Sequence, residues 1–206
     1  ISSYNPATNL YFQATIARVV RYQADIATNF TTLVPGSRHI LIGDSPKNGI
    51  PVLHESHSGG ALFFGTDGSL LVTTGDGASY NFVDGGNGAT YWSQALADSI
   101  IRPEENVGSF RSQMVNSLNG KILRIDPETG EGLNSNPFYI PGDPYAAASR
   151  VWALGLRNPF RAVLKPGTGD PDPTAGNPGT IYLGDVGWDN WEDMNICTGP
   201  GQNFGC

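Results

Sequence analysis

The stretch ALFFGTDGSLLVTTGDG, residues 61–77, predicts a β-hairpin. Two mostly apolar runs flank Asp67-Gly68, a dipeptide that readily adopts the positive φ angles of tight turns. The second run closes on Gly75-Asp76, and a later segment, GTIYLGD at 179–185, has the same plan of glycine turn, apolar strand and closing Gly-Asp. Repeated short strands with the same polar ending favour a radial β architecture, in which equivalent strands converge on one axis.

Most other patterned segments are also short and β-like, namely 10–22, 39–43, 120–130 and 150–166. Residues 80–118 are the exception, because they form a long irregular region in which the sequence predicts a short helix at 92–100, before Pro103. With 27 glycines and 15 prolines, turns are frequent. At roughly 40–50 residues per propeller blade, 206 residues provide about four blades, and fewer once the long loops are subtracted.

Charge and composition exclude several classes of protein. The formal net charge is −7 and there is no run of Lys or Arg, so a nucleic-acid partner is not expected. No apolar stretch approaches the ~20 residues of a membrane span. The scattered carboxylates of an acidic chain suit a soluble protein that holds a metal cation. The sequence also lacks G-x-G-x-x-G after a strand and a phosphate-binding P-loop, which disfavours nicotinamide and nucleotide folds.

The cysteine content and one sequon bear on the compartment. Cys197 and Cys206 lie in one glycine-rich loop, where a disulfide and two free thiols are equally compatible with the sequence. Cysteines are otherwise absent, and Asn29-Phe30-Thr31 is a glycosylation sequon. Both features favour a secreted or periplasmic location.

Ionisable side chains stand at the polar ends of several predicted strands. His57 precedes the double glycine of HSGGALFFG, while Asp76, Arg157 and Asp185 each follow an apolar run. An unpaired buried charge is costly, so such groups meet partners or face a cavity. Each could serve only to fix its own turn. The functional alternative is that all of them converge on one polar cleft, and spacing alone does not decide between the two.

Several motifs occur in an order that resembles the soluble quinoprotein glucose/sorbosone dehydrogenases, which are pyrroloquinoline-quinone (PQQ)-dependent aldose sugar dehydrogenases. These motifs are HSGGALFFGTDGSLLVTTGDG, SLNGKILRIDPETG, VWALGLRNPFR and IYLGDVGWDNWEDMN, and the resemblance extends from about residue 55 to the end. It implies an all-β, six-bladed β-propeller. This chain would supply about three to four blades as a single domain over residues 1–206, incomplete at both ends.

The resemblance also implies catalytic roles. His57 matches the general base that takes the sugar hydroxyl proton, and Asp76 matches the carboxylate that orients this histidine. Arg157 matches the arginine that polarises the quinone carbonyl as it accepts hydride, which explains a cation after an apolar run. In this interpretation Pro159 ends the strand pairing. The reaction would use a sugar substrate and an external electron acceptor.

The implied cofactors are PQQ and Ca²⁺. The resemblance assigns PQQ contacts to His57 and Arg157, and further contacts to Asn81, which stands where some members carry glutamine, and to Asp185. The backbone carbonyls of Gly187 and Trp188 match the pair that holds calcium, a cation that prefers oxygen ligands.

Two positions depart from the family pattern. The family often has a polar or charged residue just before the base, where this chain has Ser56. It often has an arginine four positions after the base, where this chain has the apolar Ala61. These departures leave open a non-catalytic propeller used as a binding module, as in the related hedgehog-interacting proteins. A third interpretation is an unrelated calcium-stabilised β-scaffold. The presence of His57, Asp76 and Arg157 in motif order favours the dehydrogenase over both.

Overall fold

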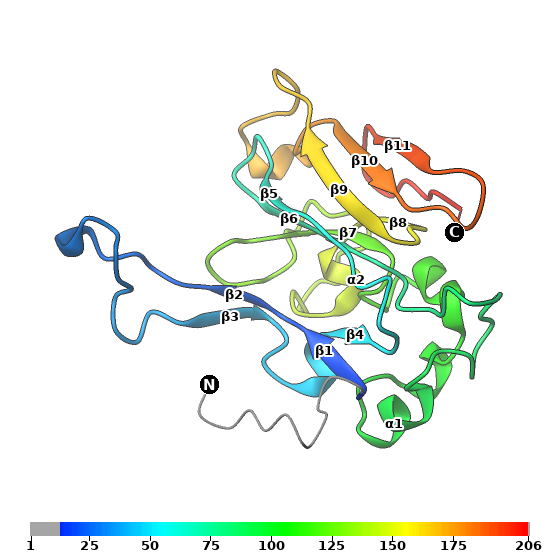
Figure 1. Ribbon diagram of the computed structural model, residues 1–206. Coiled ribbons are helices and arrows are strands. Elements are labelled where there is room, and N and C mark those ends of the chain that lie inside the picture. Colours follow the sequence, from blue (N-terminus) through cyan, green and yellow to red (C-terminus); the bar gives the residue numbers. More distant parts are fainter. Residues whose placement is uncertain (1–12, 206) are drawn as a thin grey trace.

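The computed structural model describes residues 13–205, and β-strands dominate it (Figure 1). In chain order the strands are β1 (Thr15–Ala17), β2 (Val19–Arg21), β3 (His39–Ile42), β4 (Ile50–Val52), β5 (Leu62–Phe64), β6 (Leu70–Thr74), β7 (Lys121–Ile125), β8 (Val151–Leu154), β9 (Pro159–Leu164), β10 (Ile181–Asp185) and β11 (Asp193–Cys197). The α-helices are α1 (Trp92–Ala97) and α2 (Ala147–Arg150), and the 3-10 helices are η2 (Ile26–Thr28), η3 (Pro46–Asn48), η4 (Pro103–Glu105), η5 (Gly108–Gln113) and η6 (Pro173–Ala175).

A four-stranded antiparallel sheet in the order β5-β6-β7-β8 forms the middle of the molecule. The predicted hairpin at 61–77 is confirmed, because β5 pairs with β6 and Gly68 takes a φ of +77° in the connecting turn. The predicted strands at 39–43, 120–130 and 179–187 are also confirmed as β3, β7 and β10. The predicted helix at 92–100 is shorter than expected, since α1 ends at Ala97.

Both faces of this middle sheet are covered. Alternate residues of a strand point to opposite faces. Val72 and Leu123 pack on the N-terminal strand pairs β2–β3 and β1–β4, whose cluster residues are Val19, Leu41, Ile42 and Ile50. Their neighbours Leu71 and Ile122 pack on the other face, against the sheet of β9, β10 and β11. The result is three stacked β layers, and the β9–β11 layer lies above the middle sheet in Figure 1.

This stacking confirms the all-β prediction and fits a propeller-type fold. Among residues 13–205 no sheet closes on itself, and the number of blades stays a prediction. A third apolar cluster places α1 beside the N-terminal layer through Ala95, Ile100 and Leu53. Within the described residues no helix has the length and apolar character needed to cross a membrane.

The role predicted for Pro159 was wrong. Pro159 begins β9 instead of ending a strand, and it lies opposite Asp185 of β10. Proline lacks a backbone N–H group, so the first position of a strand accepts it without losing a ladder hydrogen bond. The preceding strand β8 already ends at Leu154, before Gly155 with its φ of +82°.

The sequence left open whether Cys197 and Cys206 form a disulfide, and Cys206 lies outside the described residues. Cys197 is buried in the apolar cluster between the middle and C-terminal layers. Burial raises the pKa of its thiol to about 11.

β7 is buried along its whole length although it contains two cations. Arg124 donates from Nε and Nη2 to Asp67 Oδ2, at 2.9 and 2.6 Å, and both side chains are 0% exposed. Its other donors reach the Ser135 hydroxyl, the Asn136 side-chain carbonyl and the Pro173 carbonyl. Arg124 therefore ties the β5–β6 turn to the loops that flank β8 and β9.

We expect Asp67→Asn to lower the free energy of unfolding by about 3–5 kcal/mol, because it leaves the Arg124 guanidinium buried without its counter-charge. Urea unfolding followed by circular dichroism measures the loss. Arg21→Ala is the matched control, since Arg21 and Glu128 form an exposed ion pair, for which we expect a loss below about 1 kcal/mol. Equal losses in the two variants would contradict this account.

Lys121 begins the same strand, and its ammonium group is fully enclosed. Nζ donates to the carbonyls of Arg111, Ser112 and Asn119, at 2.9, 2.8 and 2.5 Å. Burial lowers the pKa of this lysine from 10.5 to about 7. Above pH 7 the unfolded chain therefore binds more protons at this position than the folded chain does.

Since stability rises with pH wherever the unfolded state binds more protons, Lys121 makes the free energy of unfolding increase as pH rises from about 7 toward 10. We expect Lys121→Met to remove this increase, so that the two free energies of unfolding diverge between pH 7 and 8.5. Urea titrations over that range test this, and the contribution of Cys197 cancels in the comparison because both proteins contain it. If the free energies of unfolding of the wild type and Lys121→Met depend on pH in the same way, the expectation is wrong.

Candidate functional site

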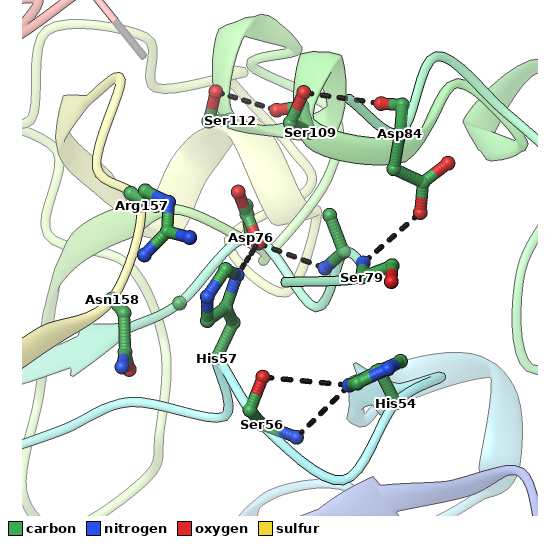
Figure 2. A network of polar contacts seen from close by, with 12 residues as sticks. His54, Ser56, His57, Asp76, Ser79, Asp84, Ser109, Ser112, Arg157 and Asn158 are labelled. Carbon is green, nitrogen blue, oxygen red and sulfur yellow. Dashed lines mark hydrogen bonds and ion pairs between the residues drawn. The ribbon is translucent and has the colours of Figure 1, made fainter. Parts of the chain in front are cut away.

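A buried imidazole–carboxylate pair lies at one end of the middle sheet. His57 precedes β5 and Asp76 follows β6, and antiparallel pairing brings both to the same end. His57 Nδ1 lies 2.9 Å from Asp76 Oδ1, which also accepts the backbone N–H of Ala78 at 2.8 Å. An ionised carboxylate only accepts hydrogen bonds, so this contact requires a proton on Nδ1, and in the neutral imidazole Nε2 then has the lone pair. Figure 2 shows this pair at the centre of a polar network.

The backbone at His57 is in a strained conformation, with a φ of +56°. Non-glycine residues rarely adopt this region, and each such residue costs roughly 1–3 kcal/mol. The conformation is held by its surroundings, because Gly77 N–H donates to the His57 carbonyl at 3.2 Å. Strain of this kind is common where a side chain must be aimed at a functional site.

Arg157 lies in the loop between β8 and β9, and its backbone contacts the His57–Asp76 pair. The Asp76 N–H donates to the Arg157 carbonyl at 2.8 Å. Asp185, at the end of β10, accepts the N–H groups of Arg157 and Asn158 at 3.0 and 2.6 Å. Figure 2 shows Arg157 and Asn158 on one side of the His57 ring and Ser79 on the other.

The Asp185 carboxylate is therefore used to shape the loop that presents Arg157. It is buried, and desolvation raises its pKa although the two backbone hydrogen bonds oppose this. These contacts place His57, Asp76, Arg157 and Asp185 near one another, and their convergence on one polar cleft stays a prediction. Their roles in catalysis stay predictions.

Asn81 is placed less centrally than expected. It lies in the loop after Asp76, its side chain is exposed, and its backbone N–H donates to the Ser79 hydroxyl at 3.2 Å. Ser56 is accounted for by a different contact, because its N–H and hydroxyl both lie within reach of His54 Nδ1, at 3.3 and 3.4 Å. His54 is itself buried against Tyr80, and burial lowers its pKa.

Sequence reasoning missed the buried cation behind the pair. Arg111 of η5 donates from Nε to the Asp76 carbonyl at 3.1 Å and from Nη1 to the Glu105 carbonyl at 3.2 Å. Its Nη2 is buried and has no hydrogen-bond partner among the described residues. Burial lowers the pKa of this guanidinium. No signal in the irregular segment 80–118 distinguishes this arginine from a solvent-exposed one.

The predicted calcium ligands do not form a free carbonyl pair. Arg157 Nη1 donates to the carbonyls of Val186 and Gly187, at 2.8 and 2.9 Å, so a guanidinium already occupies one of the two predicted ligands. Within residues 13–205, no cluster of three or more His, Cys, Asp or Glu side chains could hold a metal ion. Calcium needs six to eight oxygen ligands. The Gly187 carbonyl is therefore not a free calcium ligand in this arrangement, and calcium binding at Gly187 and Trp188 stays a prediction.

Of two cavities that residues 13–205 form, only the smaller adjoins a site residue. The larger, about 1340 Å³, is lined by residues such as His39, Arg102 and Arg150, and its lining does not include His57. The smaller, about 400 Å³, adjoins the loop whose Gly187 carbonyl binds Arg157, and its lining consists of Gly187, Trp188, Asp189, Asn190, Trp191 and Asp193.

Two curated plant proteins are similar to this chain over most of its length. The HIPL2 protein of Arabidopsis thaliana is 31% identical over 169 residues, which cover 76% of this chain and 19% of that protein. The HIPL1 protein of the same plant is 30% identical over 163 residues, covering 73% and 18%. The chain therefore spans less than a fifth of the length of these curated relatives.

A solved structure of a glucose dehydrogenase shares the fold, with a TM-score of 0.56 and 22% identity over 91% of this chain and 42% of that structure. The family model for glucose/sorbosone dehydrogenase matches residues 38–205, which include every candidate site residue discussed above. The chain therefore belongs to the glucose/sorbosone dehydrogenase family and contains part of that family's domain.

Proposed function

We propose that this chain supplies the catalytic side chains of a PQQ-dependent dehydrogenase that oxidises an aldose or a related sugar. The observation that carries the proposal is the buried His57–Asp76 pair with the Arg157 backbone bound beside it. The family membership supports it. In this proposal residues 1–206 form one domain, with about three to four blades of a six-bladed propeller. Its location is secreted or periplasmic, which the sequon at Asn29 supports.

The residues of this chain have distinct tasks in that reaction. Asp76 holds the Nδ1–H tautomer of His57, so that Nε2 takes the proton of the sugar hydroxyl. An imidazole suits this step because its ordinary pKa lies near neutrality. PQQ, when bound, accepts the hydride from the sugar carbon, which no protein side chain can do. An external electron acceptor then removes the electrons.

The donor set fits an anionic planar quinone. Arg157 is a half-buried cation held in place by Val186, Gly187 and Asp185, and a preorganised cation stabilises negative charge that develops on an oxygen. Asn158 and His57 lie beside it (Figure 2). Asp185 acts through the backbone of the Arg157 loop, and Asn81 would contribute from the loop after Asp76. We derive no step through calcium, because Arg157 occupies the Gly187 carbonyl.

A second candidate is a non-catalytic binding module. Two curated relatives are HIPL proteins, Ala61 stands where the family often has arginine, and His57 does not line the larger cavity. A binding module does not require an unprotonated Nε2 on a buried histidine. Turnover therefore separates the two functions.

We expect His57→Gln to lower kcat by at least about 10²-fold, because glutamine cannot take the hydroxyl proton. The measurement is dye reduction by aldoses, with the full-length protein supplied with PQQ and calcium. His39→Gln is the matched control, since His39 is an exposed histidine in β3 outside the site. If the wild-type protein is active and His57→Gln has the same kcat, the base is another residue. If the wild-type protein is folded but shows no turnover, the binding module is supported.

We expect Asp76→Asn to lower kcat by about 10²-fold or more while PQQ binding changes little. A carboxamide can donate to Nδ1, which moves the imidazole proton to Nε2 and removes the basic lone pair. Nitrogen-15 chemical shifts of His57 report this tautomer in the chain itself, without any cofactor. Restored activity in Asp76→Glu would support positioning of the ring, and an unchanged tautomer in Asp76→Asn would contradict it.

A further inference from the structure

Two tryptophans remain exposed in the loop that joins β10 to β11. Trp188 is 50% exposed and Trp191 is 80% exposed. Both line the 400 Å³ hollow, together with Gly187, Asp189, Asn190 and Asp193. Large aromatic side chains held in water forgo the stabilisation of burial, and such surfaces mark binding sites. The proposed chemistry at His57 makes no use of either indole.

The backbone of this loop is fixed from both ends. A Cβ atom on Gly187 would overlap the Trp191 carbonyl oxygen, so only glycine allows the loop to fold back this tightly. Glu192 Oε2 accepts the Gly187 N–H at 2.8 Å, and Arg157 Nη1 binds the Gly187 carbonyl at 2.9 Å. The same arginine therefore connects the tryptophan hollow to the His57 site.

The chemistry of the hollow indicates a neutral polyhydroxylated ligand. An indole face stacks well on the C–H bonds of a pyranose ring, and the carboxylates of Asp189 and Asp193 can accept hydrogen bonds from its hydroxyl groups. The Asn190 carboxamide can both donate and accept. The six lining residues include no lysine or arginine, which disfavours phosphates and nucleotides. A volume of about 400 Å³ is within the usual range of small-molecule sites, roughly 300–1,000 Å³.

We propose that the tryptophan hollow is a sugar-binding subsite next to Arg157. Its ligand is one pyranose unit of an oligosaccharide, whose terminal unit reaches the His57 site. The assignment of that terminal unit as the oxidised group rests on the proposed function, but binding in the hollow does not. The substrate class is then a short glycan chain, bound more tightly than a single hexose because it spans both sites.

Isothermal titration of the chain, without cofactor, tests the subsite with glucose, cellotetraose and maltotetraose. We expect at least one tetrasaccharide to bind at least tenfold more tightly than glucose, and Trp191→Ala to weaken that binding at least tenfold. Phe110→Ala is the matched control, because Phe110 is a comparably exposed aromatic residue in η5. Since Trp191 is exposed, its variant should retain the wild-type circular dichroism spectrum.

Three results would overturn the subsite: no tetrasaccharide binds the chain, Trp191→Ala binds as tightly as the wild type, or the hollow binds choline in preference to every saccharide. Choline is included because aromatic and acidic groups together also attract quaternary ammonium ions. The two proposals can fail separately. If Trp191→Ala loses saccharide binding while the full-length wild-type protein shows no turnover, the subsite is supported and the dehydrogenase proposal is wrong.

Discussion

The candidate site depends on the close approach of three backbone segments at Gly75. A Cβ atom there would overlap the His57 carbonyl oxygen and lie 3.0 Å from the Arg157 carbonyl oxygen. The next residue, Asp76, donates its N–H to the same Arg157 carbonyl. A side chain at position 75 would therefore push apart the segments that carry the imidazole, the carboxylate and the guanidinium. Gly60 has a similar role, because a Cβ there would overlap the Thr73 carbonyl oxygen.

The sequence predicted this convergence where the signal was local. The apolar runs around Asp67-Gly68 and the Gly75-Asp76 ending describe one hairpin and its polar end, and antiparallel pairing then fixes their positions. Pro159 was misassigned because proline is compatible with either end of a strand, and pairing with Asp185 decides between them. The contact between Arg157 and the Gly187 carbonyl joins residues 30 apart in sequence, and no periodicity encodes it.

Buried cations were the least predictable part of the fold. Arg111, Lys121 and Arg124 are all enclosed although the chain is acidic overall. Three carbonyls accept hydrogen bonds from Lys121, and one carboxylate with several neutral acceptors binds Arg124, so fixed oxygens replace the water that each cation loses on burial. These acceptors come from loops distant in sequence. A residue-by-residue reading places lysine and arginine at the surface, because only the assembled loops supply the oxygens.

The balance between catalysis and simple binding turns on how the polar groups at the sheet end are used. Asp185 and Arg111 are largely consumed in holding backbone groups, as scaffold residues are. The His57–Asp76 pair differs. The backbone of His57 is strained, and the bond to Asp76 uses only one of the two ring nitrogens. Asn29, Asn87 and Ser99 have a similar positive φ, but in them no titratable ring is paired with a buried carboxylate. The strained backbone at His57 and the ring nitrogen left over by Asp76 are the features that support the proposed role in proton transfer.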